Sequence, residues 1–246
     1  MRTCVVLLVA AGALAAPAAR GQARIEAAPL VTPFSAGKPG AALPAPWEPF
    51  RIAPGKKPTQ YDLVADPGTI VLHARADAAA SALRHDTRFD LRAAPIIEFR
   101  WKISRLIDDQ DNAIATKEDS PVRVILEFQG DRSRLSLRDR ASLGVGDTIA
   151  GREVPYATLM YIWSGAVPVG TMIPNPHTGR VRMIVATAGA ARVGSWVSVR
   201  RNAFDDFRTA FGEDPGPMIG VGVLTDTDNT GETVEAWYGD IRFGAP

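Results

Sequence analysis

The sequence predicts an all-β fold, an antiparallel two-sheet β-sandwich of the jelly-roll type with one short helix. Short runs rich in β-branched and aromatic residues recur along the chain, separated by Gly, Pro, Asn and Asp. In two of these runs, 96–103 and 122–128, apolar and polar residues alternate, which is typical of a strand with one face in a core and the other toward solvent or a groove. Only 203–211 has the pattern of an amphipathic helix. Many short strands with one helix favour a sandwich.

The N-terminal residues have the plan of a secretory signal peptide. Arg2 precedes an apolar run over 4–16 that is too short to cross a bilayer, and small residues follow up to Ala23. We therefore expect a signal peptide at 1–23, a single β-sandwich domain at 24–246 and a periplasmic or secreted protein. A buried N-terminal helix is the alternative, and it fits less well because the apolar run starts almost at once and ends in Pro and Ala.

Composition gives little support for a charged macromolecular partner. Loss of 1–23 would remove Arg2, Arg20 and no acidic residue, so the formal net charge would change from +1 to −1. A near-neutral chain does not favour nucleic acid or an anionic membrane surface, and we expect neither as a partner. Cys4 is the sole cysteine and falls in the predicted signal peptide, so the mature domain must fold without a disulfide. No later segment is long and apolar enough to span a membrane.

The predicted elements follow in order along the chain. Residues 24–60 are rich in Pro, Gly and Ala, which predicts an extended segment held to the body by Phe34, Trp47 and Phe50. Strands are then expected at 61–64, 69–75, 79–87, 96–103, 122–128, 159–163, 181–187, 196–199, 219–225 and 234–243. The run 79–87 is Ala-rich and also compatible with a helix, and 133–142 is left open between helix and loop.

Alternation also predicts the core. Side chains two positions apart in a strand point to the same face. On this basis we expect four residues of the two best strands in a shared core: Phe99, Trp101, Val124 and Leu126.

The single helix has signals at both ends. Asn202 can cap its first turn, and Asp205 and Asp206 suit the positive end of the helix dipole. Gly212 can end it in a left-handed conformation. We therefore expect a helix over 203–211.

Five segments in order resemble one bacterial family of exported proteins. They are FRWKI, DSPVRVILEF, LMYIWSG, RRNAFDDFRTAFGE and VLTDTDNTGETVEAWYGDI. Together they are similar to the family catalogued as domain of unknown function 3047, over roughly 34–243, and this resemblance implies no particular activity. The ending Asp240, Ile241 and Phe243 also resembles galactose-binding-like jelly rolls, among them family 11 carbohydrate-binding modules and the complex I intermediate-associated proteins. That second resemblance implies a sandwich fold and points to sugar binding.

An acidic turn between the last two predicted strands is the sharpest candidate site. Oxygen-bearing side chains alternate along it and a glycine follows, as in calcium loops, although the bidentate glutamate and the entering helix of an EF-hand are missing. The candidate metal ligands are Asp226, Asp228, Thr230 and Glu232, with calcium as the candidate ion. Asp226, Asp228 and Asn229 are candidates for binding a polar ligand. The alternative is a polar hairpin turn in which these side chains bond the local backbone. A hairpin turn explains these residues at least as well as a metal site does.

A second acidic loop lies between the strands 96–103 and 122–128. Its candidate ligand-binding residues are Asp108, Asp109 and Asp111. If this loop and the acidic turn share one end of the sandwich, the two form an acidic pocket. The alternative is a solvated surface loop.

Aromatic residues supply the third group of candidates. A flat ring beside polar groups suits the apolar face of a sugar, and the candidates are Tyr161, Trp163 and Trp237. Tyr161 and Trp163 share one face of their strand, whereas Trp237 and Tyr238 point to opposite faces. The alternative is core packing, which we expect for most aromatic residues of such a domain.

Signals for catalysis are sparse, and no catalytic residue is assigned. His73, His85 and His177 lack metal-binding spacing, and the chain has no Gly-x-Ser-x-Gly motif. Gly220-Val-Gly222 lies inside a predicted strand and lacks the third glycine and the helix of a dinucleotide-binding fingerprint. An enzyme is therefore the less favoured interpretation.

We therefore expect an exported, non-catalytic β-sandwich that binds a carbohydrate or other polar envelope ligand. One alternative is an enzyme that acts on a glycan through paired carboxylates, which must face one cleft at a set separation. Another is a structural or interaction domain without a small ligand. Binding requires exposed aromatic rings beside polar groups, and the structural role requires neither.

Overall fold

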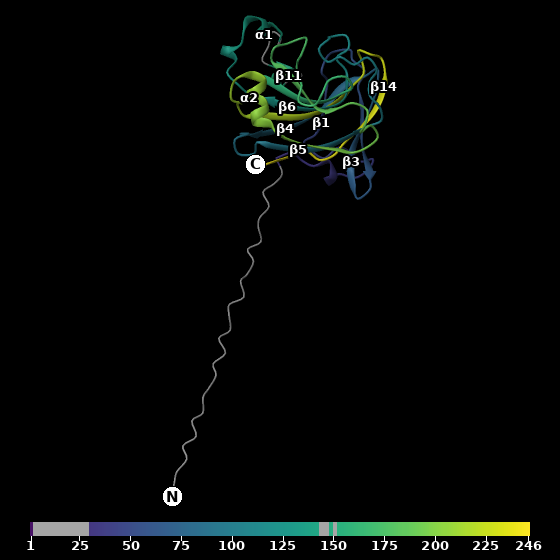
Figure 1. Cartoon of the computed structure of the whole chain (residues 1–246), viewed down its shortest axis with the longest axis vertical. Helices are drawn as coiled ribbons and strands as arrows, with labels where there is room; N and C mark the ends of the chain where they lie inside the picture. The colour runs from purple at the N-terminus through teal and green to yellow at the C-terminus, as the bar shows by residue number, and fades with distance from the viewer. Residues whose placement is uncertain (2–29, 143–147, 150–151) are drawn as a thin grey trace.

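The alternating segments pair into two β-sheets that pack face to face (Figure 1). The computed structural model describes Met1 and residues 30–142, 148–149 and 152–246. The predicted signal peptide beyond Met1 therefore lies outside the described residues. Among the described residues, no helix is long and apolar enough to cross a membrane.

The larger sheet has seven strands. In spatial order they are β1 (Glu48–Phe50), β4 (Ala80–Phe89), β13 (Met218–Asp226), β6 (Ser120–Phe128), β9 (Ala157–Ser164), β11 (Val181–Ala188) and β10 (Met172–Pro174). All neighbours are antiparallel except β9 and β11, which run parallel. This pair is the exception to the expected antiparallel arrangement, because β10 lies at the sheet edge and β11, which runs antiparallel to β10, is inserted between β10 and β9.

The smaller sheet has six strands. The spatial order is β12 (Val197–Asn202), β5 (Ile96–Ile103), β14 (Thr233–Tyr238), β3 (Thr69–Asp77) and β2 (Gln60–Asp66), and β15 (Arg242–Gly244) also pairs with β5. A separate pair is formed by β7 (Thr148–Ile149) and β8 (Arg152–Glu153). The expected single strand over 234–243 is thus two strands, because the chain leaves the sheet between Tyr238 and Arg242.

In the described part of the chain, four helical elements accompany the sheets. They are η1 (Phe34–Ala36), η2 (Arg132–Arg134), α1 (Leu137–Ser142) and α2 (Ala203–Phe211). The bounds of α2 match the expectation, since the Asn202 side chain accepts a hydrogen bond from the Asp205 N–H (3.2 Å) and Gly212 is left-handed with φ 71°. The open segment 133–142 contains part of η2 and all of α1, and the Ala-rich run 79–87 is strand from Ala80 onward, within β4.

The core lies between the sheets, as the alternation predicts. Phe99, Trp101, Val124 and Leu126 are all buried in one cluster. The Trp101 indole crosses the layer and donates a hydrogen bond to the Thr187 hydroxyl (3.0 Å). The mostly β architecture with one capped helix and a two-sheet core is the predicted β-sandwich.

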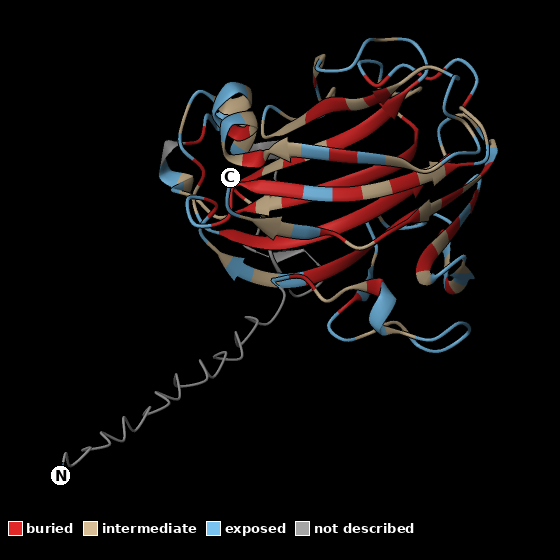
Figure 2. Cartoon of the chain, turned by 60° about the horizontal axis from the view of Figure 1, so that its bottom comes forward, coloured by how far each residue is buried: buried red, intermediate tan, exposed pale blue. Residues whose placement is uncertain are grey.

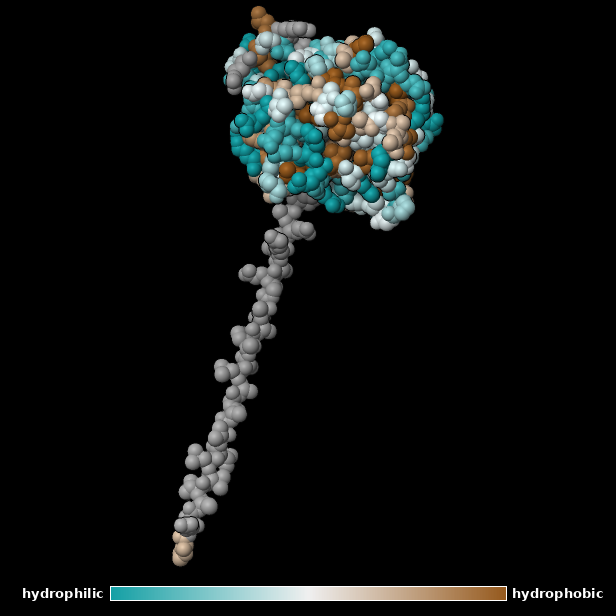
Figure 3. Space-filling model, viewed as in Figure 1, coloured by the Kyte–Doolittle hydropathy of each residue, from teal (hydrophilic) through white to brown (hydrophobic). Residues whose placement is uncertain are grey.

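The two sheets differ in how they use their outer faces. Strands β5 and β14 alternate between buried and partly exposed residues, whereas β13 is buried along its whole length. Figure 2 shows both kinds of strand, some of mixed colour and others red along most of their length. On the outer side of β13, Gly222 leaves space for an apolar pocket of about 200 Å³ whose walls include Phe50, Ile125 and Met160. Apolar residues gather around β1 on the face seen in Figure 3. The outer face of the smaller sheet is instead rich in charge.

Candidate functional site

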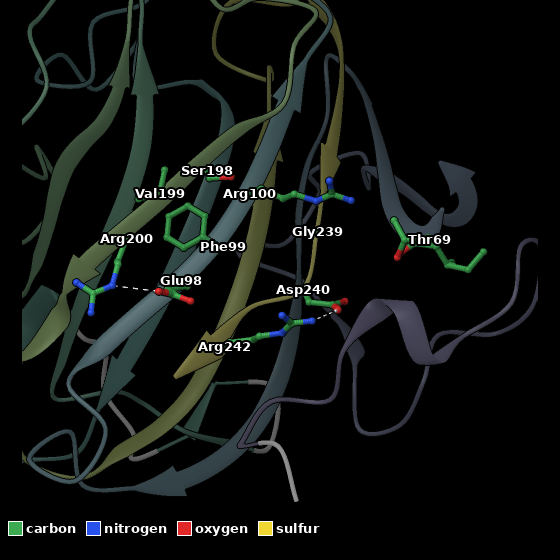
Figure 4. A pocket seen from close by; sticks show the side chains of 11 residues that line it. Thr69, Glu98, Phe99, Arg100, Ser198, Val199, Arg200, Gly239, Asp240 and Arg242 are labelled. Atoms are coloured by element: carbon green, nitrogen blue, oxygen red, sulfur yellow. Dashed lines mark hydrogen bonds and ion pairs between the residues drawn. The ribbon is translucent and has the colours of Figure 1, made fainter. Parts of the chain in front are cut away.

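The outer face of the smaller sheet carries a pocket of about 510 Å³ (Figure 4). Strands β5, β12 and β15 supply most of its charged and hydroxyl side chains: Glu98, Arg100, Ser198, Arg200, Asp240 and Arg242. The strand register sets this grouping, because Arg200 of β12 is the partner of Glu98 on one side and Arg242 of β15 is its partner on the other. Glu98 therefore lies between two arginines.

The break between β14 and β15 shapes the pocket. The Gly239 N–H donates to the Arg100 carbonyl (2.9 Å), and a Cβ at Gly239 would lie 2.6 Å from Arg100 Cγ, so only glycine lets the Arg100 side chain pass here. The next residue, Asp240, accepts hydrogen bonds from the Ser35 N–H (3.0 Å) and hydroxyl (2.7 Å). These contacts tie the N-terminal segment to the pocket rim.

The pocket arginines make few contacts with the protein. Arg200 donates Nε to Glu98 (3.0 Å), and Arg242 donates one Nη to Asp240 (3.3 Å). The Arg100 guanidinium lies 3.8 Å from Asp66. The side chains of Arg100, Arg200 and Arg242 are 36%, 59% and 74% exposed. Each guanidinium has five N–H donors, so each can bind a further acceptor.

A strip of aromatic rings and cations continues from the pocket across the sheet. The Arg100 guanidinium lies 4.3 Å from the ring centroid of Trp196, whose indole N–H donates to Asp66 (3.0 Å). Lys102 Nζ lies 5.2 Å from the Trp196 ring and 4.4 Å from the Trp237 ring. The His73 imidazole stacks on Trp237 with centroids 5.2 Å apart. We call these residues, Trp196, Arg100, Lys102, Trp237 and His73, the aromatic strip.

Of the predicted aromatic candidates, only Trp237 belongs to this strip. Tyr161 and Trp163 are fully buried in the core between the sheets, where Tyr161 donates to Asp206 (2.8 Å) and Trp163 to the Gly189 carbonyl (3.0 Å). The structure corrects their assignment as ligand-binding residues, because neither ring has a face open to a ligand. Tyr161 and Trp163 do share one face of their strand, but that face points into the core.

The acidic turn and the acidic loop lie at one end of the sandwich, which is the condition for a joint acidic pocket. Glu232 accepts hydrogen bonds from the Asp108 N–H (2.9 Å) and from Arg105 (2.5 Å). Asp119, at the end of the loop, accepts four hydrogen bonds from Asn229 and Thr230 at 2.7–3.2 Å. The two segments are therefore joined through their own donors and acceptors.

Three carboxylates of this end come close together. Asp119, Asp226 and Asp228 each place one carboxylate oxygen within 4.8 Å of the others. Arg123 binds Asp226 through Nε (2.9 Å) and Nη2 (2.8 Å), and Lys56 forms an ion pair with Asp228. Among the described residues, Thr230 joins this group only as a donor to Asp119, and Glu232 is engaged by Arg105 instead.

Burial governs the electrostatics of this acidic cluster. It raises the pKa of Asp226 to about 7, although the Arg123 guanidinium acts in the opposite direction. Burial by itself would lower the pKa of Arg123, but Asp226 and Glu118 raise it above its ordinary value. The pair is thus held by mutual attraction in a dry environment.

The cluster as it stands does not fit calcium. Calcium takes six to eight oxygen ligands, whereas a guanidinium and an ammonium already occupy two of the three carboxylates, and N–H and O–H groups occupy the third. The chain's own Arg123 and Lys56 supply the positive charge at this end.

The remaining loop candidates lie at the surface. Asp109 has φ 58° and forms an ion pair with Lys117 (2.5 Å), and Asp111 accepts a hydrogen bond from the Ala113 N–H (2.9 Å). Asp108 pairs with Arg105 (3.0 Å). All three line a shallow polar pocket of about 410 Å³ beside Gly165. The acidic turn does not line that pocket.

Comparison with known proteins gives one family and a set of distant folds. The model of the family described as "Protein of unknown function (DUF3047)" matches residues 45–242, in agreement with the resemblance in the sequence motifs. No curated protein matches the chain in sequence.

Among solved structures, the family 11 carbohydrate-binding module from Clostridium thermocellum, in complex with a mixed-linked tetrasaccharide, is 9% identical over 82% of this chain and 90% of that chain, with a TM-score of 0.43. The family 30 carbohydrate-binding module of a cellulosomal cellulase from Clostridium thermocellum is 13% identical over 87% of this chain and 94% of that chain, with a TM-score of 0.37. The xyloglucanase domain of NopAA from Sinorhizobium fredii is 8% identical over 82% of this chain and 99% of that chain, with a TM-score of 0.41. At these values the likeness says nothing of what this chain binds.

Proposed function

The chain belongs to the DUF3047 family, and for this member we propose an exported, non-catalytic β-sandwich that binds a carbohydrate or other polar ligand of the cell envelope. The site is the pocket on the outer face of the smaller sheet together with the aromatic strip. The observation that carries the proposal is the direct continuation of an open polar pocket into two partly exposed tryptophans, Trp196 and Trp237.

The chemistry of the site suits a polyhydroxylated ligand. Sugar hydroxyls pair with carboxylates, guanidinium groups and hydroxyls, and Glu98, Arg100 and Ser198 offer all three. Indole rings suit the apolar faces of sugar rings. The pocket also has apolar wall residues, Phe99 and Val199, between its charged groups.

A binding role fits the carboxylates of this pocket better than hydrolysis. A glycosidase needs one carboxyl that gives a proton and a second that attacks or activates water. Glu98 is bound by Arg200, and Asp240 is bound by Ser35 and Arg242. Both carboxylates are thus already used to shape the pocket wall.

Binding is tested with the double variant Trp196→Ala/Trp237→Ala. Wild-type protein is titrated calorimetrically with a panel of neutral and acidic polysaccharides. Each stacking contact is worth about 0.5–1.5 kcal/mol, so the double variant should bind the best glycan about tenfold or more weakly. Val169→Ala, an exposed apolar residue in the loop before β10, is the control and should bind as wild type does. A wild-type protein that binds no polysaccharide would refute the proposal.

Export is tested separately from binding. Arg2, the apolar run 4–16 and the small residues up to Ala23 support it. Mass spectrometry of the protein made in a Gram-negative host should find a mature N-terminus between Ala19 and Arg24. An intact Met1 on cytoplasmic protein would contradict export without affecting the binding site.

A further inference from the structure

The three arginines of the pocket define the charge of its ligand. We infer that the pocket binds a carboxylate-bearing glycan, one that contains uronic acid residues, through Arg100, Arg200 and Arg242. This inference rests on the proposed binding function and names the ligand class within it.

The first argument is the supply of hydrogen-bond donors. Within the described part of the chain, Arg200 uses Nε alone, Arg242 uses one Nη alone, and the Arg100 side chain makes an ion-pair contact but no hydrogen bond. A guanidinium presents its N–H groups in a fixed planar fork that matches a carboxylate in two parallel hydrogen bonds. Three such forks line one pocket with most of their donors free for a ligand.

Other arginines of the same protein are used differently. Arg123 donates to Asp226, to Glu118 and to the Glu118 carbonyl. Arg201 grips Asp206 through two nitrogens at 2.9 and 2.5 Å. These guanidinium groups are bound by several acceptors of the protein. The small number of hydrogen bonds at the pocket arginines is therefore a feature of the pocket and not of every arginine in the chain.

The second argument is charge balance. The charged side chains that line the pocket are three arginines and two acids, Glu98 and Asp240. Asp240 is further occupied by two hydrogen bonds from Ser35. On the adjoining strip Lys102 lies over both tryptophans, and Asp66 contacts both Lys102 (3.7 Å) and Arg100 (3.8 Å). Three arginines against two acids leave the pocket lining with one positive charge in excess, which an anionic ligand would balance and a cationic ligand would not.

The third argument is the place of Arg100 at the junction of pocket and strip. Its guanidinium lines the pocket and also lies over the Trp196 ring. A sugar ring bound beside Trp196 would therefore lie next to this guanidinium, which can accept a carboxylate borne on that ring. A neutral sugar would fill the same space without balancing that charge.

The experiment compares two ligands that share one backbone. Oligogalacturonate carries a carboxylate on every residue, and its methyl ester carries the same sugars without the charge. Calorimetric titration at low salt should show oligogalacturonate bound at least about tenfold more tightly than the ester, since a charge-assisted hydrogen bond exceeds a neutral one. The preference should shrink as salt is raised.

Variants then assign the preference to the pocket. Arg100→Gln, Arg200→Gln and Arg242→Gln should each weaken oligogalacturonate binding by a larger factor than ester binding, so that the ratio of the two affinities falls toward one. Arg92→Gln removes an arginine of similar exposure (55%) that pairs with Asp90 and Asp214 away from the pocket, and it should leave the preference intact.

The outcomes separate the two proposals. Equal binding of oligogalacturonate and its ester, or tighter binding of the ester, would overturn the acidic-glycan inference and leave the binding function standing. Binding of neither ligand nor of any other polysaccharide would overturn both. The comparison of ligands uses wild-type protein, so it decides the inference even if a variant fails to fold.

Discussion

Strand β14 connects two charged regions that differ in how they use their charges. At its beginning lies the acidic cluster, where Asp119, Asp226 and Arg123 are buried and bind one another or the turn. At its end lies the pocket, where the side chains of Arg200 and Arg242 are exposed and each bonds one carboxylate among the described residues. The acidic cluster has the more conspicuous sequence pattern, yet its groups are already satisfied. Free donors and acceptors, more than the density of charge, distinguish a binding region from a structural one.

The difference has a physical cause in desolvation. A buried charge costs several kcal/mol unless a partner compensates for it, so a buried cluster must be complete within the fold. An exposed charge is compensated by water and can exchange that water for a ligand. The acidic cluster should therefore respond to mutation mainly through stability, and the pocket mainly through binding.

The largest effect is expected for Arg123→Met. This change leaves Asp226 buried without its cation and removes the contacts to Glu118. Breaking a buried ion pair by removing one partner costs about 3–5 kcal/mol, and the free energy of unfolding from urea titration should fall by that amount. Arg200→Met in the pocket is the matched control and should change it by less than about 0.5 kcal/mol. Similar losses for both variants would break the comparison.

A smaller effect is expected for Asp119→Asn. The carboxylate accepts four hydrogen bonds from Asn229 and Thr230, and an amide can replace only the acceptors of one oxygen. Loss of acceptors for buried donors costs about 1–3 kcal/mol. Asp109→Asn, at an exposed carboxylate (82%) of the same loop, should have almost no effect on the denaturation midpoint. An unchanged midpoint for Asp119→Asn would show that the turn does not depend on this anchor.

The fold could be predicted wherever its signals are local. The alternation of 96–103 gives β5 its bounds, and Asn202 and Gly212 give α2 its ends, because a strand face and a helix cap depend on neighbours in the chain. The parallel pairing of β9 and β11 depends on where β10 lies in the sheet, and no local pattern records that.

The site could be predicted only in part for the same reason. The sequence places Trp237 and Tyr238 on opposite faces of one strand but does not say which face is outward, and Tyr161 and Trp163, equally aromatic, lie inside. The sequence shows Glu98, Arg100 and Lys102 on one outward face, yet Arg200 and Arg242 come from strands more than 90 residues later in the chain. Likewise Asp226 finds Arg123 across 103 positions. Such contacts appear only once the strand register is known.

Calcium tests whether the acidic cluster is complete within the fold, and the expected effect on stability is modest. If Arg123 and Lys56 supply the positive charge of the acidic cluster, the melting temperature of the wild type should not change between calcium and a chelator. Lys56→Met removes the ammonium from Asp228, an ion pair in which the Lys56 side chain is 40% and the Asp228 side chain 9% exposed, and the expected cost is about 1 kcal/mol. Calcium should then stabilise this variant, because a cation that binds only the folded state raises its stability. Stabilisation of the wild type by calcium would show instead that the cluster takes a metal as it stands.

The smallest effects on stability are expected for the pocket arginines themselves. Arg200 and Arg242 each contribute one exposed ion pair, and such pairs are worth about 0–1 kcal/mol. Arg200→Gln and Arg242→Gln should therefore leave the urea midpoint within error of wild type. Arg100→Gln should cost slightly more, about 0.5–1 kcal/mol, because the guanidinium also lies over Trp196. A loss above about 2 kcal/mol in any of the three would mean that the fold uses these arginines as it uses Arg123, and the pocket would then have no charge to offer a ligand.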